Sequence, residues 1–386
     1  MSSSDNKEFL KLGRDAYDHA VTLKHNGGYD SSKKQSYRDY IETDKLLSLQ
    51  YSSLNKGLFH HDEHLFIVIH QNFEIWFTQV LWELQSVRNI LQLKEKVQHK
   101  NPVLVNGLSQ RDARVACKRL ARCDRIIRLA TQNFDILETM DPSDFLEFRD
   151  YIGPGSGFQS RQMRELEIII GLKAHERVKC GGNDFRIAFK PDECNRLEFL
   201  MKSDSLLTCV QNWLAGIKVP AKFQDVFMKA KLNNLREQKK LWNMESSKVD
   251  AMIKKETDRL EPYFAGGDEF GENETNLSDD EKKIIGKRRL AALFVLSYRQ
   301  HPKFTPYADL LDLAIGCEQA VMLWRSRHLR MVDRMIGTRV GTGGSSGTGY
   351  LMKTVKKYRV FKDLWYMRTI FVKNSSLPSL DELQAM

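Results

Sequence analysis

Apolar residues recur at helical spacing along most of the chain, and the breakers between these stretches predict where helices end. The longest predicted helix runs over residues 62–97, is dense in Phe, Trp, Ile and Leu, and has Asp62 as its N-cap. A second helix is expected over residues 110–138, because Asp141 and Pro142 then end the pattern. These two stretches predict long helices that are buried on most sides.

The middle of the chain alternates short helical stretches with breakers. We predict a short helix over residues 143–150, a break at 153–157, and a helix over residues 159–171. Residues 173–220 are less regular, and a helix is expected near residues 203–215. This part of the chain is therefore the least defined by its pattern.

Residues 221–262 form a highly charged periodic stretch that predicts one or two long helices. Such polar helices either project from the core as a hairpin or lie across a subunit contact. Beyond them the pattern predicts a polar loop, two strong helices, a glycine-rich loop and a last amphipathic helix, at residues 265–280, 279–299, 307–336, 341–347 and 350–372.

Both ends of the chain are polar. Residues 1–60 predict an arm that contains a short segment at 37–41 and a helix near 44–50. The tail from Lys373 is short and is expected to be loose. No internal repeat is evident.

Composition agrees with an all-α, multi-helix fold. The chain has 386 residues, of which 41% are hydrophobic and only 9 are proline, and this favours long helices over a sandwich of short strands. We predict an arm over residues 1–60 and a single helical domain over residues 61–386. Within that domain, residues 221–264 are a charged helical insertion.

The formal net charge of +10 raises the question of a nucleic-acid partner. The basic residues, however, are interleaved with acids, as at residues 237–240 and 254–256, which is typical of solvated helix faces. We therefore expect no nucleic-acid partner. An anionic cofactor or substrate accounts for local positive charge at least as well.

The 6 cysteines include no CxxC pair, so the sequence indicates neither a disulfide framework nor a zinc site. A reducing compartment follows from that usage. The first residues lack the apolar core of a signal peptide, and no stretch approaches the ~20 apolar residues of a membrane span. We expect a cytoplasmic protein with no membrane partner.

Two histidines lie within apolar helical stretches. His70 has Phe66 four positions before it and Phe73 three positions after it, on one helix face. His328 has Trp324 four positions before it, and an adjoining basic strip of Arg327, Arg330 and Arg334. A neutral imidazole with dry walls and nearby cations suits haem, whose iron binds nitrogen and whose propionates need positive partners. The alternative is that both are core histidines, His70 bonded to a backbone carbonyl and His328 lying beside a surface stripe of arginines.

Arg149 and a glycine-rich loop are the other candidates for chemistry. Arg149 lies among aromatic residues in the run 144–151, where a guanidinium could bind a carboxylate through paired hydrogen bonds. A neighbouring acid such as Asp150 could equally be its partner. The loop over residues 341–347 could bind an anion, act as a lid, or be a plain connector.

Four segments closely resemble the tryptophan 2,3-dioxygenase family. The resemblance spans the chain from about Tyr37 to Val372, although residues 173–260 carry little of it. The segments are His61 to His70 with Phe73 to Phe77; Ile136 to Met140; Asp144 to Tyr151 with Ser156 to Ser160; and His328 to Tyr350, including Arg334-Met335 and the glycine-rich loop.

The resemblance implies a haem enzyme that converts L-tryptophan and O2 into N-formyl-L-kynurenine, the first step of the kynurenine pathway. It implies one haem b per subunit, with its iron ligated by His328. Trp324, Ser156 and Tyr350 match haem-side or pocket-lining positions of the family.

The same resemblance implies how the substrate is held. His70 would lie on the distal side near the indole N–H, and Arg149 would bind the substrate carboxylate. Thr342 would contact the head group, while Phe66 and Phe145 would form walls around the indole.

The resemblance also implies a homotetramer. Tyr37 and Tyr40 match positions on an arm that completes the pocket of a neighbouring subunit. The expected partners are therefore L-tryptophan, O2 and further copies of this chain.

The chain departs from the family pattern at a few positions. Ser326-Arg327 stands where Tyr-Asn is common before the histidine, and Thr348-Gly349 intervenes before Tyr350. Arg161 replaces an apolar residue, and Met163 replaces a phenylalanine. These changes concern the haem side and the loop, and they spare the residues that would contact the substrate.

Two other functions fit parts of the pattern. A haem relative could act on another indole or serve as a sensor, and product detection would distinguish it. A basic helical RNA-binding protein would have no cofactor, and its RNA affinity would fall steeply with salt.

Overall fold

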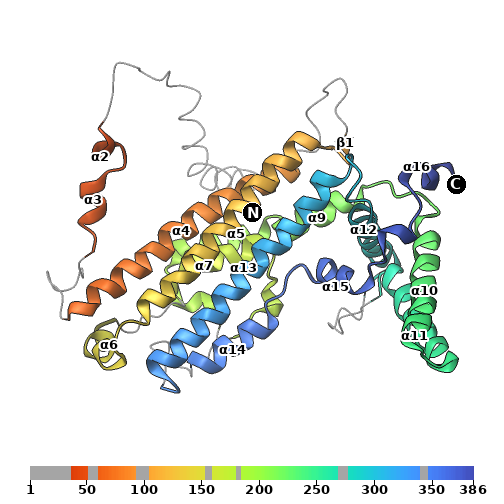
Figure 1. The fold of residues 1–386 in the computed structure, drawn as a ribbon. Coiled ribbons are helices and arrows are strands. Elements are labelled where there is room, and N and C mark those ends of the chain that lie inside the picture. The colour runs from red at the N-terminus through yellow and green to blue at the C-terminus, as the bar shows by residue number, and fades with distance from the viewer. Residues whose placement is uncertain are drawn as a thin grey trace, which may run out of the picture.

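The computed structural model describes residues 36–50, 60–92, 104–152, 159–179, 184–267, 277–339 and 347–386. Regular structure in these residues is almost entirely helical, which confirms the all-α prediction (Figure 1). The one sheet found there is a two-stranded hairpin, β1 (Leu104–Val105) and β2 (Leu108–Ser109). Asn106 and Gly107 both have positive φ at its turn, as the tightest hairpin turns require.

A long helical bundle forms one half of the molecule. Helix α4 (His61–Gln92) packs against α5 (Gln110–Leu137), α13 (Thr305–Ile336) runs along α5, and α7 (Arg161–Ile170) packs on α4 (Figure 1). The buried face of α4 includes Phe73, Phe77, Val80, Leu84, Val87 and Leu91, spaced three or four residues apart. The apolar period thus fixes which face of each long helix enters the core.

The start of α4 differs from the prediction. Asp62 was expected as its N-cap, but the helix already begins at His61, so Asp62 lies in the first turn. An acid in a first turn still faces the positive end of the helix dipole. The sequence thus correctly predicted an acid at the start of this helix, although the helix begins before Asp62.

The end of the bundle is closed by short helices. These are α6 (Pro142–Arg149) and α14 (Gly347–Lys357), followed by α15 (Lys362–Ile370). The single helix predicted over residues 350–372 was wrong, because the chain breaks between α14 and α15. Buried Glu318 on α13 accepts hydrogen bonds there from the backbone N–H of Val360, from Phe361 N at 3.2 Å and from Trp365 Nε1 at 2.6 Å. The Glu318 carboxylate thus accepts backbone hydrogen bonds that helix carbonyls would accept if α14 and α15 were one continuous helix.

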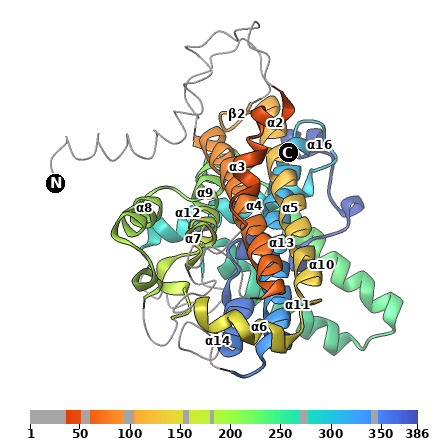
Figure 2. The same ribbon diagram turned by 90° about the vertical axis from the view of Figure 1, so that its left-hand side faces the viewer.

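Two short helices pack on the bundle: α8 (Pro191–Lys202), which the sequence pattern missed, contacts α7, and the expected α9 (Leu206–Ala215) contacts α4. The charged stretch forms two helices, α10 (Phe223–Trp242) and α11 (Ser246–Phe264). They lie side by side and project from the bundle as a hairpin, one of the two predicted arrangements (Figures 1 and 2). Helix α12 (Asp279–Ser297) contacts α11, α9 and α15, and it forms the other half of the molecule together with this hairpin.

A buried arginine joins three helices in this half. Arg289 on α12 donates to Asp363 Oδ1 at 2.9 Å, to the carbonyl of Tyr263 at 2.9 Å and to that of Gly267 at 2.7 Å. Its guanidinium also lies over the Tyr263 ring, 4.2 Å from the ring centre. One arginine in the middle of α12 thereby holds the carboxyl end of α11 and the amino end of α15 together.

Short helices occur in the described residues of both the arm and the tail. The arm contains α2 (Tyr37–Tyr40) and α3 (Thr43–Leu47), and Gln71 on α4 donates to the carbonyl of Leu49 just beyond them. The expectation of a loose tail was wrong, because residues 374–376 form a 3-10 turn and α16 (Leu380–Ala385) follows. Leu380 and Leu383 are buried, so an apolar pair at helical spacing fixes the tail.

In the part of the chain that the structure describes, none of the helices is both long and apolar enough to cross a membrane.

Candidate active site

A cavity of about 800 Å³ lies at the end of the bundle, between α4, α6, α7, α13 and α14. Segments far apart in the sequence meet there, including Leu46, Leu49 and Gln50 of the arm. The residues that line it include seven of the predicted site residues: Phe66, His70, Phe145, Arg149, Trp324, His328 and Tyr350.

The remaining predicted residues do not lie on this cavity in the described structure. Tyr37 and Tyr40 are on α2, with exposed fractions of 79% and 71%. Ser156 and Thr342, with most of the glycine-rich loop, fall outside the described residues. Their predicted roles therefore stay predictions.

His70 presents one ring nitrogen to the cavity. Its Nδ1 lies 2.7 Å from the carbonyl oxygen of Phe66, and a carbonyl only accepts, so Nδ1 carries the proton in the neutral ring. Burial lowers the pKa of His70, which favours that neutral ring. The core interpretation of His70 correctly predicted a backbone bond. The same bond leaves Nε2 unprotonated, as a hydrogen-bond acceptor.

Aromatic rings surround His70 on the cavity wall. The Phe66 ring stacks on it with the ring centres 3.9 Å apart, and Phe145 lies 5.7 Å from Phe66. Arg149 follows Phe145 by one helical turn on α6 and lines the same cavity. Two flat apolar walls therefore lie beside a cation that can bind a carboxylate.

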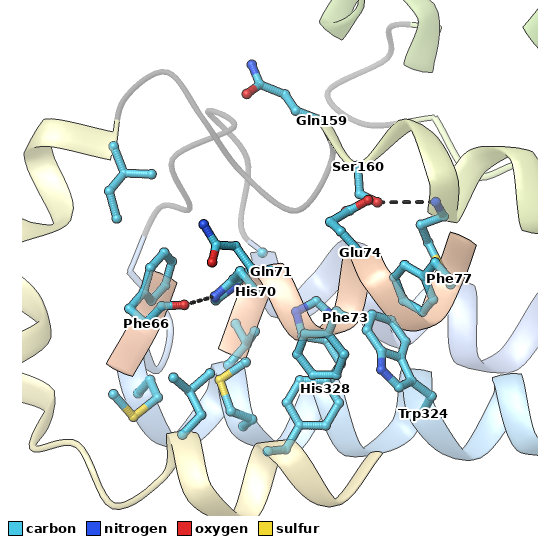
Figure 3. Close-up of a pocket in the computed structure, with 18 of the residues that line it drawn as sticks. Phe66, His70, Gln71, Phe73, Glu74, Phe77, Gln159, Ser160, Trp324 and His328 are labelled. Atoms are coloured by element: carbon cyan, nitrogen blue, oxygen red, sulfur yellow. Dashed lines mark hydrogen bonds between the residues drawn. The ribbon is translucent and has the colours of Figure 1, made fainter. Parts of the chain in front are cut away.

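His328 lines the same cavity as His70 and comes from α13 (Figure 3). Its ring stacks on Phe134 at 5.6 Å and lies 5.2 Å from Trp324. Burial, reinforced by His70 and by the guanidiniums of Arg325 and Arg164, lowers the pKa of His328 to about 3. The imidazole is therefore neutral, the form in which histidine binds metals.

Trp324 has a buried polar atom that faces no acceptor among the described residues. Its ring is enclosed by Phe73, Phe77 and Phe134, with ring centres 5.4 to 5.7 Å away. Its indole Nε1 is buried and has no hydrogen-bond partner within the described ranges. A buried N–H without an acceptor is costly, so this position favours a ligand that supplies one.

A buried ionic cluster that sequence reasoning missed lies beside the cavity. Glu167 on α7 binds three guanidiniums, those of Arg164, Arg177 and Arg325. Burial raises the pKa of Glu167, but the three cations lower it by more, to about 2. A signal was present in the sequence, because Arg164 and Glu167 are three residues apart, on one face of a helix.

The basic strip predicted beside His328 has a different role. Arg327 donates to Glu138 at 2.5 and 2.8 Å and to Asp135 at 2.6 Å, and Arg334 also pairs with Glu138. These pairs bind α13 to the end of α5. The expectation that Arg327 and Arg334 serve an anionic cofactor is thus wrong for the described structure, in which Arg164 and Arg325 line the cavity instead.

Comparison with known proteins agrees with the resemblance in the sequence. A family model described as tryptophan 2,3-dioxygenase matches residues 23–371. The chain belongs to the tryptophan 2,3-dioxygenase family.

Several relatives of that family are similar over most of their length. Tryptophan 2,3-dioxygenase B of Danio rerio is 35% identical over 92% of this chain and 87% of the relative. Tryptophan 2,3-dioxygenase 2 of Ralstonia nicotianae is 34% identical over 90% of this chain and 96% of the relative. The Mus musculus enzyme is 36% identical over 90% of this chain and 84% of the relative.

Members of the tryptophan 2,3-dioxygenase family depend on haem, and the cavity of this chain fits that group. It combines a buried neutral imidazole, apolar walls, an indole N–H that needs an acceptor, and two arginines of a cluster with more cations than anions. No group of three or more His, Cys, Asp or Glu that could hold a metal ion occurs among the described residues. Haem iron needs only one or two protein ligands, so a single imidazole is sufficient.

Proposed function

We propose that this chain converts L-tryptophan and O2 into N-formyl-L-kynurenine, with one haem b per subunit and His328 as the ligand of its iron. Membership of the tryptophan 2,3-dioxygenase family over nearly the whole chain supports the reaction. The observation that carries the site assignment is the meeting of His70, Arg149 and His328 on one apolar cavity. When bound, haem supplies the iron that activates O2 for insertion of both oxygen atoms into the indole ring.

The cofactor-side residues supply a ligand, walls and hydrogen-bond donors. His328 offers a neutral nitrogen, and burial keeps protons from competing for it. Trp324 Nε1 and the guanidiniums of Arg164 and Arg325 would face the carboxylates of the cofactor. Tyr350 lines the same wall, and Ser156 is proposed as a further contact.

The substrate-side residues orient tryptophan. Arg149 binds its carboxylate, Thr342 contacts its head group, and Phe66 and Phe145 flank the indole. Fixing the indole in this way replaces a bimolecular encounter with a positioned one.

His70 has a defined part in that positioning. Because its Nδ1 proton is donated to the carbonyl of Phe66, Nε2 can accept the indole N–H. That hydrogen bond orients the ring without removing the proton. We assign no general-base step to His70, since the indole N–H is very weakly acidic.

The arm is proposed to complete the pocket of a neighbouring subunit within a cytoplasmic homotetramer. Tyr37 and Tyr40 are large aromatic residues with most of their surface exposed, which favours burial against a partner. An active monomer, measured by sedimentation together with turnover, would contradict arm sharing.

The test of this function compares full-length wild type with His328→Ala after haem reconstitution. We expect a Soret band and formation of N-formyl-L-kynurenine for wild type, and loss of both the ligated spectrum and turnover for the variant. His175→Ala is the matched control, because His175 is exposed on a 3-10 turn. A Soret band that is indifferent to His328 would exclude the assignment, and turnover of a different indole would redirect it.

A further inference from the structure

Four charged side chains form one buried cluster beside the cavity. Arg164 donates to both carboxylate oxygens of Glu167, at 3.1 and 3.0 Å, Arg177 donates at 2.5 Å, and Arg325 donates to Oε1. Glu167 is 3% exposed, and Arg164 and Arg325 are each 6% exposed. Within these four side chains, three positive charges share one negative charge.

The cluster has two sides. Arg164 and Arg325 line the cavity, whereas Glu167 and Arg177 are not among the described residues that line it. Arg177 reaches Glu167 from the segment after α7, and its guanidinium lies 4.8 Å from the centre of the Phe185 ring. Changing Glu167 or Arg177 therefore alters the charge of the cluster without removing a side chain that lines the cavity.

Neighbouring groups fix the two wall arginines in place. Arg164 interacts with the side chain of Tyr350 as well as with Glu167, and Arg325 lies over the ring of Tyr358 at 4.6 Å. Tyr358 is itself held, because its hydroxyl accepts from Val178 N at 3.0 Å. Glu167 is the point at which all three guanidiniums meet.

A surplus of buried positive charge is costly unless an anion lies nearby. One further acid, Asp184, acts on Arg177 but is already paired with Arg186. The excess positive charge of the cluster therefore faces the cavity, because Arg164 and Arg325 line it. A ligand with two carboxylates balances a net charge of two.

We propose that Glu167 is a positioning residue that holds Arg164 and Arg325 on the cavity wall and, with Arg177 behind them, sets the surplus charge met by a dianionic cofactor. This inference rests on the proposed haem function. It assigns to Glu167 and Arg177 a role in tuning the cofactor, although neither lines the cavity.

The test changes the charge of the cluster in both directions, in the full-length chain. Glu167→Gln adds one net positive charge, Arg177→Gln removes one, and the double variant restores the original value. Glu83→Gln is the matched control, because Glu83 is also 3% exposed and pairs with Arg119 and Arg122 of α5, and none of these three residues lines the cavity. Two readouts are used: the midpoint potential of bound haem, and the preference for protoporphyrin IX over its dimethyl ester.

We expect opposite shifts from the two single variants. One charge near the cavity changes an equilibrium about three- to tenfold, which corresponds to about 30–60 mV for a one-electron potential. The potential should rise in Glu167→Gln and fall in Arg177→Gln, because added positive charge favours the ferrous state. Preference for the diacid should fall in Arg177→Gln, and both readouts should return toward wild type in the double variant.

Other outcomes overturn the inference. Shifts of the same sign in both single variants indicate a merely structural cluster, as does a shift in Glu83→Gln of the same size. If Glu167→Gln does not fold, Arg177→Gln decides alone, and an unchanged potential there refutes the proposal. If wild type binds haem and turns over tryptophan but the charge variants shift neither readout, only this inference is refuted. If wild type binds neither porphyrin, the proposed function is refuted as well.

Discussion

Two buried arginine clusters lie in opposite halves of the molecule, and they are satisfied differently. Arg289 is enclosed by one carboxylate, two backbone carbonyls and an aromatic face, so protein groups satisfy it. The Glu167 cluster holds three guanidiniums on one carboxylate, and two of them line a cavity. A buried cation enclosed by protein acceptors indicates architecture, whereas a surplus beside a cavity indicates a ligand.

The comparison predicts that the two halves respond to different measurements. Variants of the Arg289 cluster should change the free energy of unfolding and leave substrate affinity alone. Variants of residues that line the cavity should change substrate affinity and leave the free energy of unfolding nearly unchanged. Three experiments test this separation.

The largest effect is expected from Arg289→Ala. It removes the guanidinium that pairs with Asp363 and donates to the carbonyls of Tyr263 and Gly267, so the free energy of unfolding should fall by about 3–5 kcal/mol. Urea unfolding measures this loss, and the KM for tryptophan of the folded fraction should not change. Arg288→Ala is the control, because Arg288 precedes Arg289 on α12, donates to Asn212 at 3.4 Å and acts on Asp363 through its charge, whereas Arg289 also donates a hydrogen bond to Asp363. A larger loss for Arg288→Ala would contradict the assignment.

A pH-dependent effect is expected from Glu167. Its pKa is about 2 in the folded chain against 4.5 ordinarily, so its carboxylate stabilises the fold above pH 4.5 and that stabilisation disappears as pH falls toward 2. The whole window is worth about 3 kcal/mol. The difference in unfolding free energy between wild type and Glu167→Gln should be about 2 kcal/mol smaller at pH 3 than at pH 7.

Asp363 provides the contrast for that measurement. Burial raises the pKa of Asp363 despite the nearby Arg289, so its contribution to stability is present below its ordinary pKa and is lost as pH rises through the folded value. Asp363→Asn should therefore change the pH slope in the opposite direction from Glu167→Gln. Slopes of the same sign would remove the distinction between the two clusters.

A smaller effect is expected from Arg149→Met on the cavity wall. Loss of hydrogen bonds between a guanidinium and the substrate carboxylate should lower kcat/KM for tryptophan by about 2 kcal/mol, or ~30-fold. The free energy of unfolding should stay within about 0.5 kcal/mol, because the side chain is only partly buried. Steady-state kinetics and urea unfolding of the same preparation check both statements. Unchanged kinetics would show that Arg149 does not bind the substrate.

Helices with a strong apolar period could be predicted from the sequence. The helices α5, α12 and α13 lie close to their expected ranges, because one buried face recurs over many turns. Helix α8 was missed, since its two buried leucines give too weak a period. The break after α14 was also missed, because it depends on Glu318, about 40 residues earlier in the chain.

The candidate site was predictable in part. His70 and His328 were recognisable from their apolar surroundings, and the structure places both on one cavity. The Glu167 cluster was not predicted, because its arginines come from α7, the segment after it and α13, and only the fold unites them. Arg327 illustrates the converse error: a cation beside His328 in sequence is turned by helix geometry toward Glu138.

The hydrogen bonds that Glu318 accepts just after α14 limit how that helix can move beside the cavity. Because this carboxylate fixes the chain just after α14, that helix is anchored at its carboxyl end. A helix that is anchored at its carboxyl end has most of its freedom at its amino end, where Gly347 and Tyr350 lie. A movement of α14 that admits a planar guest would therefore pivot about a point fixed by α13, the same helix that carries His328.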